Sequence, residues 1–559
     1  MTSSSRASKA VSVDHIERPF FRSPPFPGVA PDEAAISQQR ADAPGNVAID
    51  DPFLNAIAQA RVGGTFWGDR PTGVKLLVRQ GVMPPATLLE GLAHDEIGIL
   101  PVGGVGKAAV AGRMLPPDCD PWALVEQAQA VCALPGDDVA TVAFLLGKPV
   151  FGPDKQAVPP ATLKAVTIGR LARVAYRDCF TGATINVADA LELLSDWRRH
   201  LDGNRGLAAA SGMAFWKRQA IRHFLWDGVR SPPFLSARHG LAQARRHKGA
   251  LAVWPSRVPP TIAADAADAG VALARVEAGF LRSRGLGAAL HPPGSVVVDR
   301  RGIYYDATAP SDLEQLLANH PFPQALVERA ARLRARLCAT GVTKYGDQAG
   351  AATALPPGRR TVLAVGQVDD DLSVRLGGAG VGGNLDFLER VRRVEPDAWI
   401  IYRPHPDVQA GHRRGHLSEA AILRHADAID TGGSLMALVE AVDEVHVLSS
   451  LTGFEALIRG ISVTVHGMPF YAGWGLTRDL ARANPRRGRL LTVDQLVAGT
   501  LILYPRYLDP VTGLPCGPEL MVDRMASNVA PATNWLIRLR SLQGRMRRLM
   551  TLSAEFFHG

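Results

Sequence analysis

Polar side chains follow directly on three apolar segments that we predict to be strands of one sheet. These segments are TVLAVGQV (361–368), AWIIYR (398–403) and EVHVLS (444–449). In open α/β sheets, ligands bind beyond the carboxyl ends of the strands. We therefore expect the polar residues at these three ends to face one cleft. They are Gln367, Asp369, Asp370, Asp371, Arg403, His405, Ser449, Ser450, Thr452 and Gly453.

The hydroxyl-rich segment Ser449-Ser450-Leu-Thr452-Gly453 opens a predicted helix, GFEALIRG. Hydroxyls and free backbone N–H groups at a helix N-terminus attract phosphate, and the helix dipole adds to that attraction. Serine and threonine are also common N-caps without any ligand. The sequence alone leaves both interpretations open.

His405 lies between Pro404 and Pro406, which restrict the backbone and remove local N–H donors. An imidazole held in this way can donate to a leaving phosphate or act as an acid. The alternative is a loop histidine without a function.

The acidic trio Asp369–Asp371 follows a predicted strand and faces the expected phosphate site. Three consecutive side chains cannot all converge, so we expect no metal ion there. One member of the trio can serve as a nucleophile or base. A solvated acidic turn is the alternative.

Glu277 directly follows a further predicted strand, VALARV (271–276), and precedes Ala278-Gly279. A carboxylate at this position is well placed for acid–base chemistry across a cleft, although a surface glutamate at a strand end would look the same. The glycine-rich segments GGVGK (103–107) and GGAGVGG (377–383) lack the context of a dinucleotide or P-loop motif, so we interpret both as loops.

Apolar strands that alternate with amphipathic helices, such as residues 323–339, predict parallel sheets in an α/β protein. The pattern breaks near 345–360, which suggests two Rossmann-type domains facing a cleft. We expect a poorly ordered leader over 1–50, a degenerate α/β domain over 51–205, Rossmann-like domains over 206–355 and 356–510, and C-terminal helices over 511–559. Further predicted strands are VKLLV (74–78), IGILPV (97–102), ALAVW (250–254), SVVVD (295–299) and SVTVHG (462–467).

A weak internal repeat relates residues 131–152 to residues 445–467. Both segments read as strand, loop, helix, glycine and strand. The first copy lacks the hydroxyl pair and the glutamate of the second. We interpret it as a decayed duplicate, and a chance match between two generic βαβ units is the alternative.

The 559 residues are 47% hydrophobic and carry a net charge of +9. The chain can therefore bury a core, and it is too long for a single average domain. Five cysteines form no CxxC pair, which argues against a disulfide scaffold or a cysteine-based zinc site. No apolar signal segment or membrane-spanning run is visible. The cations show no nucleic-acid-binding motif, so we expect no nucleic acid partner.

The C-terminal segment 527–559 contains five arginines and one glutamate, with leucine and methionine at near-helical spacing. Such a basic amphipathic helix suits the surface of an anionic bilayer. The alternative is a helix packed back onto the first Rossmann-like domain.

Residues 249–510 closely resemble the KpsC-type capsular polysaccharide Kdo glycosyltransferases. The resemblance covers about 260 residues, with several long motifs in the same order. They include VEAGFLRSRGLGAAL, VGQVDDDLSVRLG, IIYRPHPDV, DEVHVLSSLTGFEALIRG and HGMPFYAGWGLTRD.

The resemblance implies a GT-B-like retaining β-Kdo transferase that uses CMP-Kdo without a metal or cofactor. It implies a lysophosphatidylglycerol-type or Kdo-lipid acceptor, and a cytoplasmic protein peripheral to the inner face of the cytoplasmic membrane. It also allows contact with other capsule assembly proteins. Two alternatives are a non-catalytic capsule export or assembly protein and a transferase for another CMP-sugar.

The resemblance also assigns roles to individual residues. It makes Glu277 the general acid/base, Asp371 the nucleophile and His405 a phosphate contact, while Asp369 and Asp370 remain open as nucleophiles. Donor binding falls to Arg403, Ser449, Ser450, Thr452, Gly453 and Glu455. Candidate substrate contacts are Arg282, Ser283, Gln367, Tyr471 and Trp474. For Tyr471 and Trp474 the alternative is that their aromatic loop packs into the core.

This chain departs from the family pattern at three places. Ala278 stands where a second acid is frequent, and Arg403 stands where lysine is usual. Residues 51–205 resemble only a reduced first module without the serine pair or the catalytic acids. We therefore expect one active site rather than two.

Overall fold

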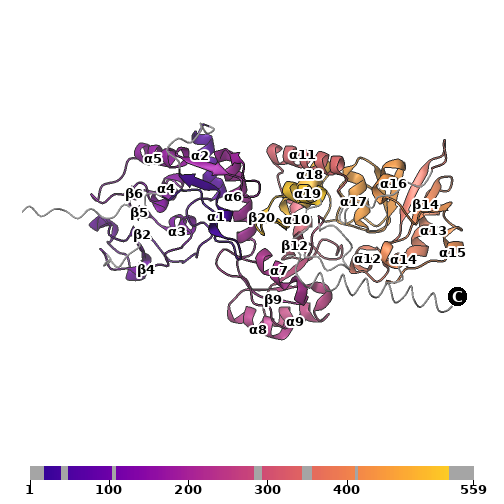
Figure 1. Ribbon diagram of the computed structural model, residues 1–559. Helices are drawn as coiled ribbons and strands as arrows, with labels where there is room; N and C mark the ends of the chain where they lie inside the picture. The colour runs from indigo at the N-terminus through magenta and orange to yellow at the C-terminus, as the bar shows by residue number, and fades with distance from the viewer. Residues whose placement is uncertain are drawn as a thin grey trace, which may run out of the picture. The chain divides into compact units, whose positions relative to one another are not determined.

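The computed structural model describes residues 18–39, 48–102, 109–281, 293–342, 355–409 and 413–527 (Figure 1). The chain divides into two compact units. Unit 1 comprises residues 1–205, 225–231 and 512–514, and unit 2 comprises residues 206–224, 232–511 and 515–559. Both units combine helices with strands, so the expected α/β class is confirmed.

One sheet of unit 2 contains six parallel strands in the order β15-β14-β13-β16-β17-β18. All five residues of β13 are buried, as expected for a strand that is covered on both faces. The predicted strands of this region are confirmed. The strands are β13 (Thr361–Val365), β14 (Trp399–Arg403), β15 (Ala428–Ile429), β16 (Glu444–Val447), β17 (Ser462–Val465) and β18 (Arg478–Asp479).

Helices connect these strands, and their N-termini follow the carboxyl ends of β13, β14 and β16. The core between strands and helices includes Phe387, Leu388 and Tyr402. In the glycine-rich segment 377–383, Gly377 ends one helix and residues 378–383 form the loop to the next helix. The helices are α12 (Leu372–Gly377), α13 (Asn384–Val394), α14 (Pro406–Gln409), α15 (Glu419–Ile422), α16 (Leu435–Ala441) and α17 (Leu451–Ile458).

The second sheet of unit 2 has the order β20-β19-β12-β11-β10-β9 and is mixed. β9, β10 and β11 are parallel, whereas β12 runs antiparallel to β11 and β19 runs antiparallel to β12. The prediction of a wholly parallel sheet is therefore wrong here, because antiparallel neighbours need no crossover helix between them. The strands are β9 (Leu207–Ser211), β10 (Ala250–Val253), β11 (Leu273–Ala278), β12 (Ser295–Asp299), β19 (Pro505–Leu508) and β20 (Pro515–Cys516).

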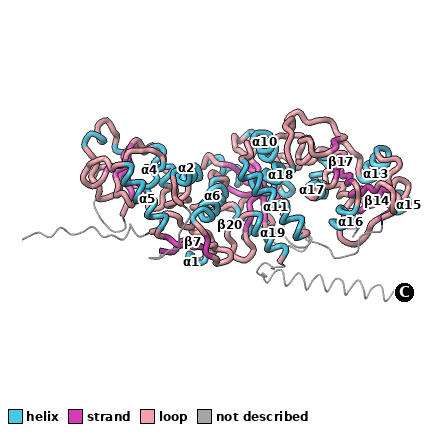
Figure 2. The backbone as a smooth tube through the Cα atoms, turned by 90° about the horizontal axis from the view of Figure 1, so that it is seen from above, coloured by secondary structure: helices cyan, strands magenta, loops and turns pink. Residues whose placement is uncertain are grey.

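We expected residues 505–508 to belong to the domain over 356–510. They form β19, which pairs with β12 in the second sheet, so that expected boundary is corrected. Nearby, α11 (Gln324–Thr340), α18 (Val493–Val497) and α19 (Pro518–Ala526) lie side by side (Figure 2). Arg329 on α11 donates to Glu519 on α19 at 2.8 Å. The basic tail beyond residue 527 lies outside the described residues.

Unit 1 contains a parallel sheet in the order β4-β3-β2-β5-β6. This is the relative order of β15-β14-β13-β16-β17 in unit 2. In each sheet one helix links the fourth strand to the fifth: α4 (Asp138–Leu145) here and α17 in unit 2. The strand–helix–strand reading of both repeat segments is confirmed. The strands are β2 (Leu76–Arg79), β3 (Ile97–Leu100), β4 (Arg113–Met114), β5 (Ala130–Cys132) and β6 (Val150–Phe151).

The expectation of a poorly ordered leader is wrong for residues 18–39. Phe20 and Phe21 are buried in the core of unit 1 with exposed fractions of 1% and 0%. β1 (Ser37–Gln39) pairs antiparallel with β7 (Val174–Arg177). The aromatic pair supplies the apolar area that holds this proline-rich segment in place. Residues 1–17 and 40–47 lie outside the described residues.

Candidate active site

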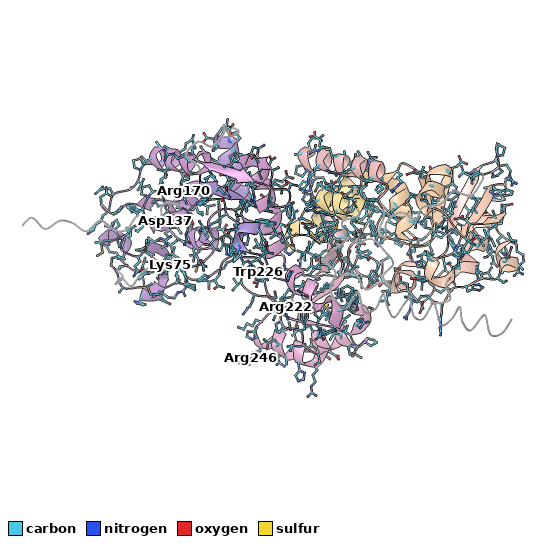
Figure 3. The ribbon with its side chains drawn as sticks, in the orientation of Figure 1. Lys75, Asp137, Arg170, Arg222, Trp226 and Arg246 are labelled. Carbon is cyan, nitrogen blue, oxygen red and sulfur yellow. The ribbon has the colours of Figure 1, made fainter. Side chains whose placement is uncertain are left out.

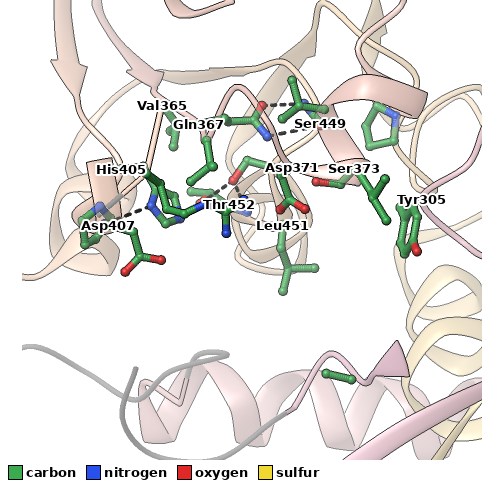
Figure 4. A pocket seen from close by; sticks show the side chains of 18 of the residues that line it. Tyr305, Val365, Gln367, Asp371, Ser373, His405, Asp407, Ser449, Leu451 and Thr452 are labelled. Carbon is green, nitrogen blue, oxygen red and sulfur yellow. Dashed lines mark hydrogen bonds between the residues drawn. The ribbon is translucent and has the colours of Figure 1, made fainter. Parts of the chain in front are cut away.

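A pocket of about 820 Å³ lies in unit 2 and is lined by residues from both of its sheets (Figure 4). Its wall includes residues that follow β13, β14 and β16, and others on or after β9, β10 and β11. The structure therefore brings most of the expected site residues together. Those in the lining are Glu277, Gln367, Asp370, Asp371, Arg403, His405, Ser449, Ser450, Thr452 and Glu455.

The hydroxyl segment after β16 is held by Gln367 from the end of β13. The Ser449 N–H donates to Gln367 Oε1 at 2.8 Å, and Gln367 Nε2 donates to Ser449 Oγ at 3.2 Å. Ser450 is the N-cap of α17, and its Oγ accepts the Thr452 N–H at 3.2 Å. These contacts aim the N-terminus of α17 and the hydroxyls into the pocket, where an anion is favoured.

Gly453 does not line the pocket but allows a close approach behind it. A Cβ atom at residue 453 would lie 2.4 Å from Tyr471 Oη. The same Tyr471 hydroxyl donates to the Ser450 carbonyl. Gly453 therefore supports the first turn of α17, and a side chain there would displace Tyr471.

Four expected substrate contacts do not appear in the described pocket. Tyr471 and Trp474 are fully buried, with exposed fractions of 0%, and neither lines the pocket. The Trp474 indole N–H donates to the Phe470 carbonyl at 2.8 Å. The interpretation of these two rings as substrate contacts is wrong, because the aromatic loop packs into the core. Arg282 and Ser283 lie outside the described residues.

His405 directly precedes α14 and lines the pocket. Its Nδ1 accepts the Asp407 N–H at 3.1 Å (Figure 4). A neutral imidazole with this acceptor role carries its proton on Nε2. Because His405 lines the pocket, the Nε2–H can serve as a hydrogen-bond donor to a bound oxygen.

The three acids after β13 have different environments. Asp369 is not in the pocket lining, and burial raises the pKa of its carboxyl group, with Asp370 adding to the rise. Asp370 forms an ion pair with Arg413 at 3.1 Å. Asp371 is the N-cap of α12, but its side chain caps no N–H group. In the described part of the chain, the Asp371 carboxylate has neither a hydrogen bond nor an ion pair.

Glu277 faces the same pocket from β11. Its Oε1 accepts the Ala278 N–H at 3.0 Å. Gly279 is needed two residues later, because a Cβ there would lie 2.3 Å from Ser295 Oγ on β12. The acid–glycine pattern thus combines a carboxylate in the pocket with a close approach between two strands.

Tyr305 is a pocket residue that the sequence analysis did not identify. Burial raises the pKa of its phenol group, and the nearby Glu277 and Asp371 raise it further. Tyr305 therefore remains a neutral hydrogen-bond donor at physiological pH. Figure 4 shows Tyr305 and Asp371 facing the same open space.

Arg403 lines the pocket with a guanidinium group that is already engaged. It forms an ion pair with Asp430 and donates to the carbonyls of Gly432 and Gly433, at 2.9 Å each. The residue is 9% exposed. These contacts position the loop after β15, and the role of Arg403 in donor binding stays a prediction.

Comparisons with known proteins agree with this arrangement. Residues 249–507 match the family model for "Capsule polysaccharide biosynthesis protein". A solved structure, Thermosulfurimonas dismutans KpsC, beta Kdo 2,4 transferase, is 31% identical. The match covers 57% of this chain and 98% of that chain, with a TM-score of 0.50. The chain belongs to the KpsC-type capsule polysaccharide biosynthesis family.

Two curated relatives also match. The capsule polysaccharide modification protein LipA of Neisseria meningitidis (serogroup A / serotype 4A) is 38% identical over 368 residues, which are 66% of this chain and 51% of LipA. The lipopolysaccharide-processing protein LpsZ of Rhizobium meliloti is 44% identical over 241 residues, covering 42% of this chain and 54% of LpsZ. The chain thus spans about half the length of the curated relatives that it matches.

The sheet of unit 1 has a different residue at the position that corresponds to Ser450 in unit 2. There Asp137 is the N-cap of α4, and its carboxylate accepts two hydrogen bonds from Arg79 at the end of β2, at 2.7 and 2.5 Å. An internal carboxylate therefore occupies the helix N-terminus that holds hydroxyls in unit 2. The next residue, Asp138, forms an ion pair with Arg170 at 2.7 Å. Asp137 and Arg170 are labelled in Figure 3.

One group of potential metal ligands exists among the described residues: Glu395, Glu444 and His446. Arg360 forms ion pairs with both carboxylates, and Arg478 pairs with Glu395 at 2.9 Å. The guanidinium groups of these two arginines offset the negative charges of the two carboxylates. We interpret the group as a structural ion-pair network on β16 and its neighbours.

The pocket contains further residues that the sequence analysis missed: Trp216, Lys217, Trp254 and Arg257. They follow β9 and β10, whose carboxyl ends face the pocket. Trp254 ends the predicted strand ALAVW. The rule that ligands bind beyond the carboxyl ends of strands could therefore have identified it. Trp216 and Lys217 gave no such signal, because β9 is an alanine-rich segment that we did not predict as a strand.

Proposed function

We propose that this chain is a GT-B-like retaining β-Kdo transferase that moves Kdo from CMP-Kdo to a glycolipid acceptor in capsule synthesis. The observation that carries the proposal is the pocket itself. It combines the Asp371 carboxylate, which has no hydrogen bond or ion pair among the described residues, a second carboxylate at Glu277 and the hydroxyl-lined N-terminus of α17. The similarity to the T. dismutans KpsC beta Kdo 2,4 transferase supports the choice of sugar.

The donor phosphate is assigned to the N-terminus of α17. Ser449, Ser450 and Thr452 supply hydroxyls there, and the helix dipole favours a negative charge. His405 Nε2–H donates to a phosphate oxygen and stabilises the charge that develops when CMP leaves. Gln367 and Arg403 keep the loops in position without needing to touch the donor.

Retention of configuration by double displacement requires a carboxylate nucleophile and a second group that acts as base. In the first step the Asp371 carboxylate attacks the anomeric carbon, and the bond from that carbon to the CMP phosphate oxygen breaks. In the second step Glu277 takes the proton of the acceptor hydroxyl. The acceptor oxygen then attacks the anomeric carbon and releases Asp371.

The reaction as proposed needs no metal or cofactor. We assign the acceptor to the lysophosphatidylglycerol or Kdo-lipid class, and the protein to the inner face of the cytoplasmic membrane. None of the described helices is long and apolar enough to cross a bilayer. Binding at the membrane surface would instead use the basic segment 528–559, together with other capsule assembly proteins.

The decisive experiment incubates the purified chain with CMP-Kdo and a synthetic Kdo-lipid, followed by linkage analysis of the product. We expect release of CMP and a new β-linked Kdo residue. Other CMP-sugars are tested in parallel. Turnover of another CMP-sugar alone would replace the donor, and no turnover of any donor with folded protein would favour a non-catalytic assembly role.

A further inference from the structure

One wall of the pocket in unit 2 lies apart from the residues to which we assigned the donor. It is formed by η3 (Phe215–Lys217), which follows β9, and η4 (Pro255–Arg257), which follows β10. β9 and β10 are parallel neighbours, so both segments leave the sheet at the same edge. The residues of this wall that line the pocket are Trp216, Lys217, Trp254, Ser256 and Arg257.

Lys217 is held in this wall by two indole rings. Its Nζ lies 3.7 Å from the ring centroid of Trp254 and 5.0 Å from that of Trp216. Lys217 is 8% exposed and Trp254 is 5% exposed. Cation–π contacts of this kind stabilise an ammonium group where water is largely excluded. They fix a positive charge at one point of the pocket wall.

The charges of the pocket are unevenly distributed. The carboxylates in the lining come from β11 and from loops and helices of the other sheet. Two arginines of that other sheet stand among them, and they pair with carboxylates: Arg403 with Asp430, and Arg413 with Asp370. The only ionisable residues that the wall after β9 and β10 contributes to the described lining are Lys217 and Arg257, both cations.

We propose that Trp216, Lys217, Trp254 and Arg257 form the subsite for an acceptor sugar that carries a carboxylate or a phosphate. The ammonium and guanidinium groups pair with the anion, and the indole edges border the apolar face of the ring. This inference rests on the proposed function, which assigns the donor phosphate to the N-terminus of α17 and leaves the wall after β9 and β10 for the acceptor.

Binding measurements on the full chain, with CMP present to fill the donor site, test the subsite without requiring turnover. The probes are a Kdo methyl glycoside, its neutral carboxamide analogue and glycerophosphoglycerol. We expect at least one anionic probe to bind about tenfold more tightly than the carboxamide. The anionic probe that shows the preference identifies the source of the anion as the sugar carboxylate or the lipid phosphate.

The variant Lys217→Gln should remove that preference, and Arg257→Gln should weaken it. In turnover assays Lys217→Gln should raise the KM for the acceptor about tenfold more than the KM for CMP-Kdo. The control is Arg246→Gln, because Arg246 is exposed at the end of α8 (Ala237–Arg246; labelled in Figure 3) and is not part of the pocket lining. This control should leave both binding and turnover unchanged.

Equal binding of the anionic and neutral probes by the wild-type chain would overturn the subsite, as would a preference that persists in Lys217→Gln. Should Lys217→Gln fail to fold, Arg257→Gln, an exposed position, decides the question with the same probes. Failure of the proposed function has a different signature, since the wild-type chain would then release no CMP from CMP-Kdo whatever the probes show.

Discussion

Gln367 and Ser449 hold each other through two hydrogen bonds, one to the backbone and one to the side chain of Ser449. The pair joins the loops that follow β13 and β16, which are neighbouring strands. The Gln367 backbone is itself fixed, because its N–H donates to Asn384 Oδ1 at 2.8 Å and its carbonyl accepts from Asn384 Nδ2 at 2.8 Å. One amide side chain thus sets the position of the expected phosphate site.

Replacing Gln367 with alanine should therefore weaken donor binding without direct loss of a catalytic group. We expect the KM for CMP-Kdo to rise about tenfold in Gln367→Ala, since Ser449 loses both hydrogen bonds, each worth about 1 kcal/mol. Initial-rate kinetics measure the effect. Ser449→Ala is a separate variant, because it removes a hydroxyl that we assign to the donor phosphate as well as one contact with Gln367. An unchanged KM for CMP-Kdo in a folded Gln367→Ala variant would contradict this positioning role.

Asp371 should be indispensable for turnover. Because the amide of Asp371→Asn is not a nucleophile, we expect CMP release to fall by about a thousandfold or more, with little change in thermal stability. The matched control is Asp370→Asn, which removes only an exposed ion pair with Arg413 and should retain turnover within about threefold.

Intact-mass measurement of the protein with CMP-Kdo alone provides a second readout for Asp371. A covalent Kdo adduct that maps to residue 371 would support the nucleophile assignment. An adduct on Asp369 or Asp370, or near-normal CMP release by Asp371→Asn, would move the nucleophile elsewhere.

Gly279 should be required for the geometry of Glu277. A methyl group at residue 279 would meet Ser295 Oγ at 2.3 Å and Ser295 Cβ at 2.9 Å, so β11 and β12 would have to separate. We expect Gly279→Ala to lower kcat at least tenfold by displacing Glu277. The double variant Gly279→Ala/Ser295→Gly removes the opposing side chain and should recover part of the activity. No recovery in a folded double variant would indicate that the clash is not the cause.

The sequence predicts the pocket of unit 2 well because strand β13 and its neighbours are short, apolar and separated by helices. Parallel strands of this type put their carboxyl ends at one edge, so Gln367, His405 and Ser449 could be expected to meet. Local pattern carries no information about β19, which crosses more than 200 residues of sequence to pair with β12. That pairing depends on tertiary packing, which overrides local signals.

The sequence pattern also could not predict the burial and the partners of individual side chains. Tyr471 and Trp474 have the residue types of a nucleotide-stacking loop, but both lie in the core. Arg403 follows a strand as expected, yet Asp430 reaches it from 27 residues along the chain. Conversely, Phe20 and Phe21 lie in the segment that we expected to be poorly ordered, and they pack into the core of unit 1. Each case depends on a partner that is distant in sequence.

His466 makes the stability of unit 2 dependent on pH. Its Nε2 lies 3.1 Å from His446 Nδ1 in the core, and its exposed fraction is 5%. Burial lowers the pKa of His466 to about 3, and the positive fields of His446, Arg390 and Arg478 contribute to the shift. In the unfolded chain the pKa of a histidine is about 6.5. Between these two values the unfolded state binds a proton that the folded state does not.

The free energy of unfolding should therefore fall as the pH drops below about 6.5, with a loss of roughly 2 kcal/mol by pH 5 from this group. Urea unfolding at pH 7 and pH 5 measures the difference. His466→Gln keeps a nitrogen donor near His446 but cannot titrate, so its stability should change less between the two pH values. The control His247→Gln replaces an exposed histidine and should keep the wild-type dependence. An identical pH dependence in His466→Gln and the wild type would show that other groups cause the loss.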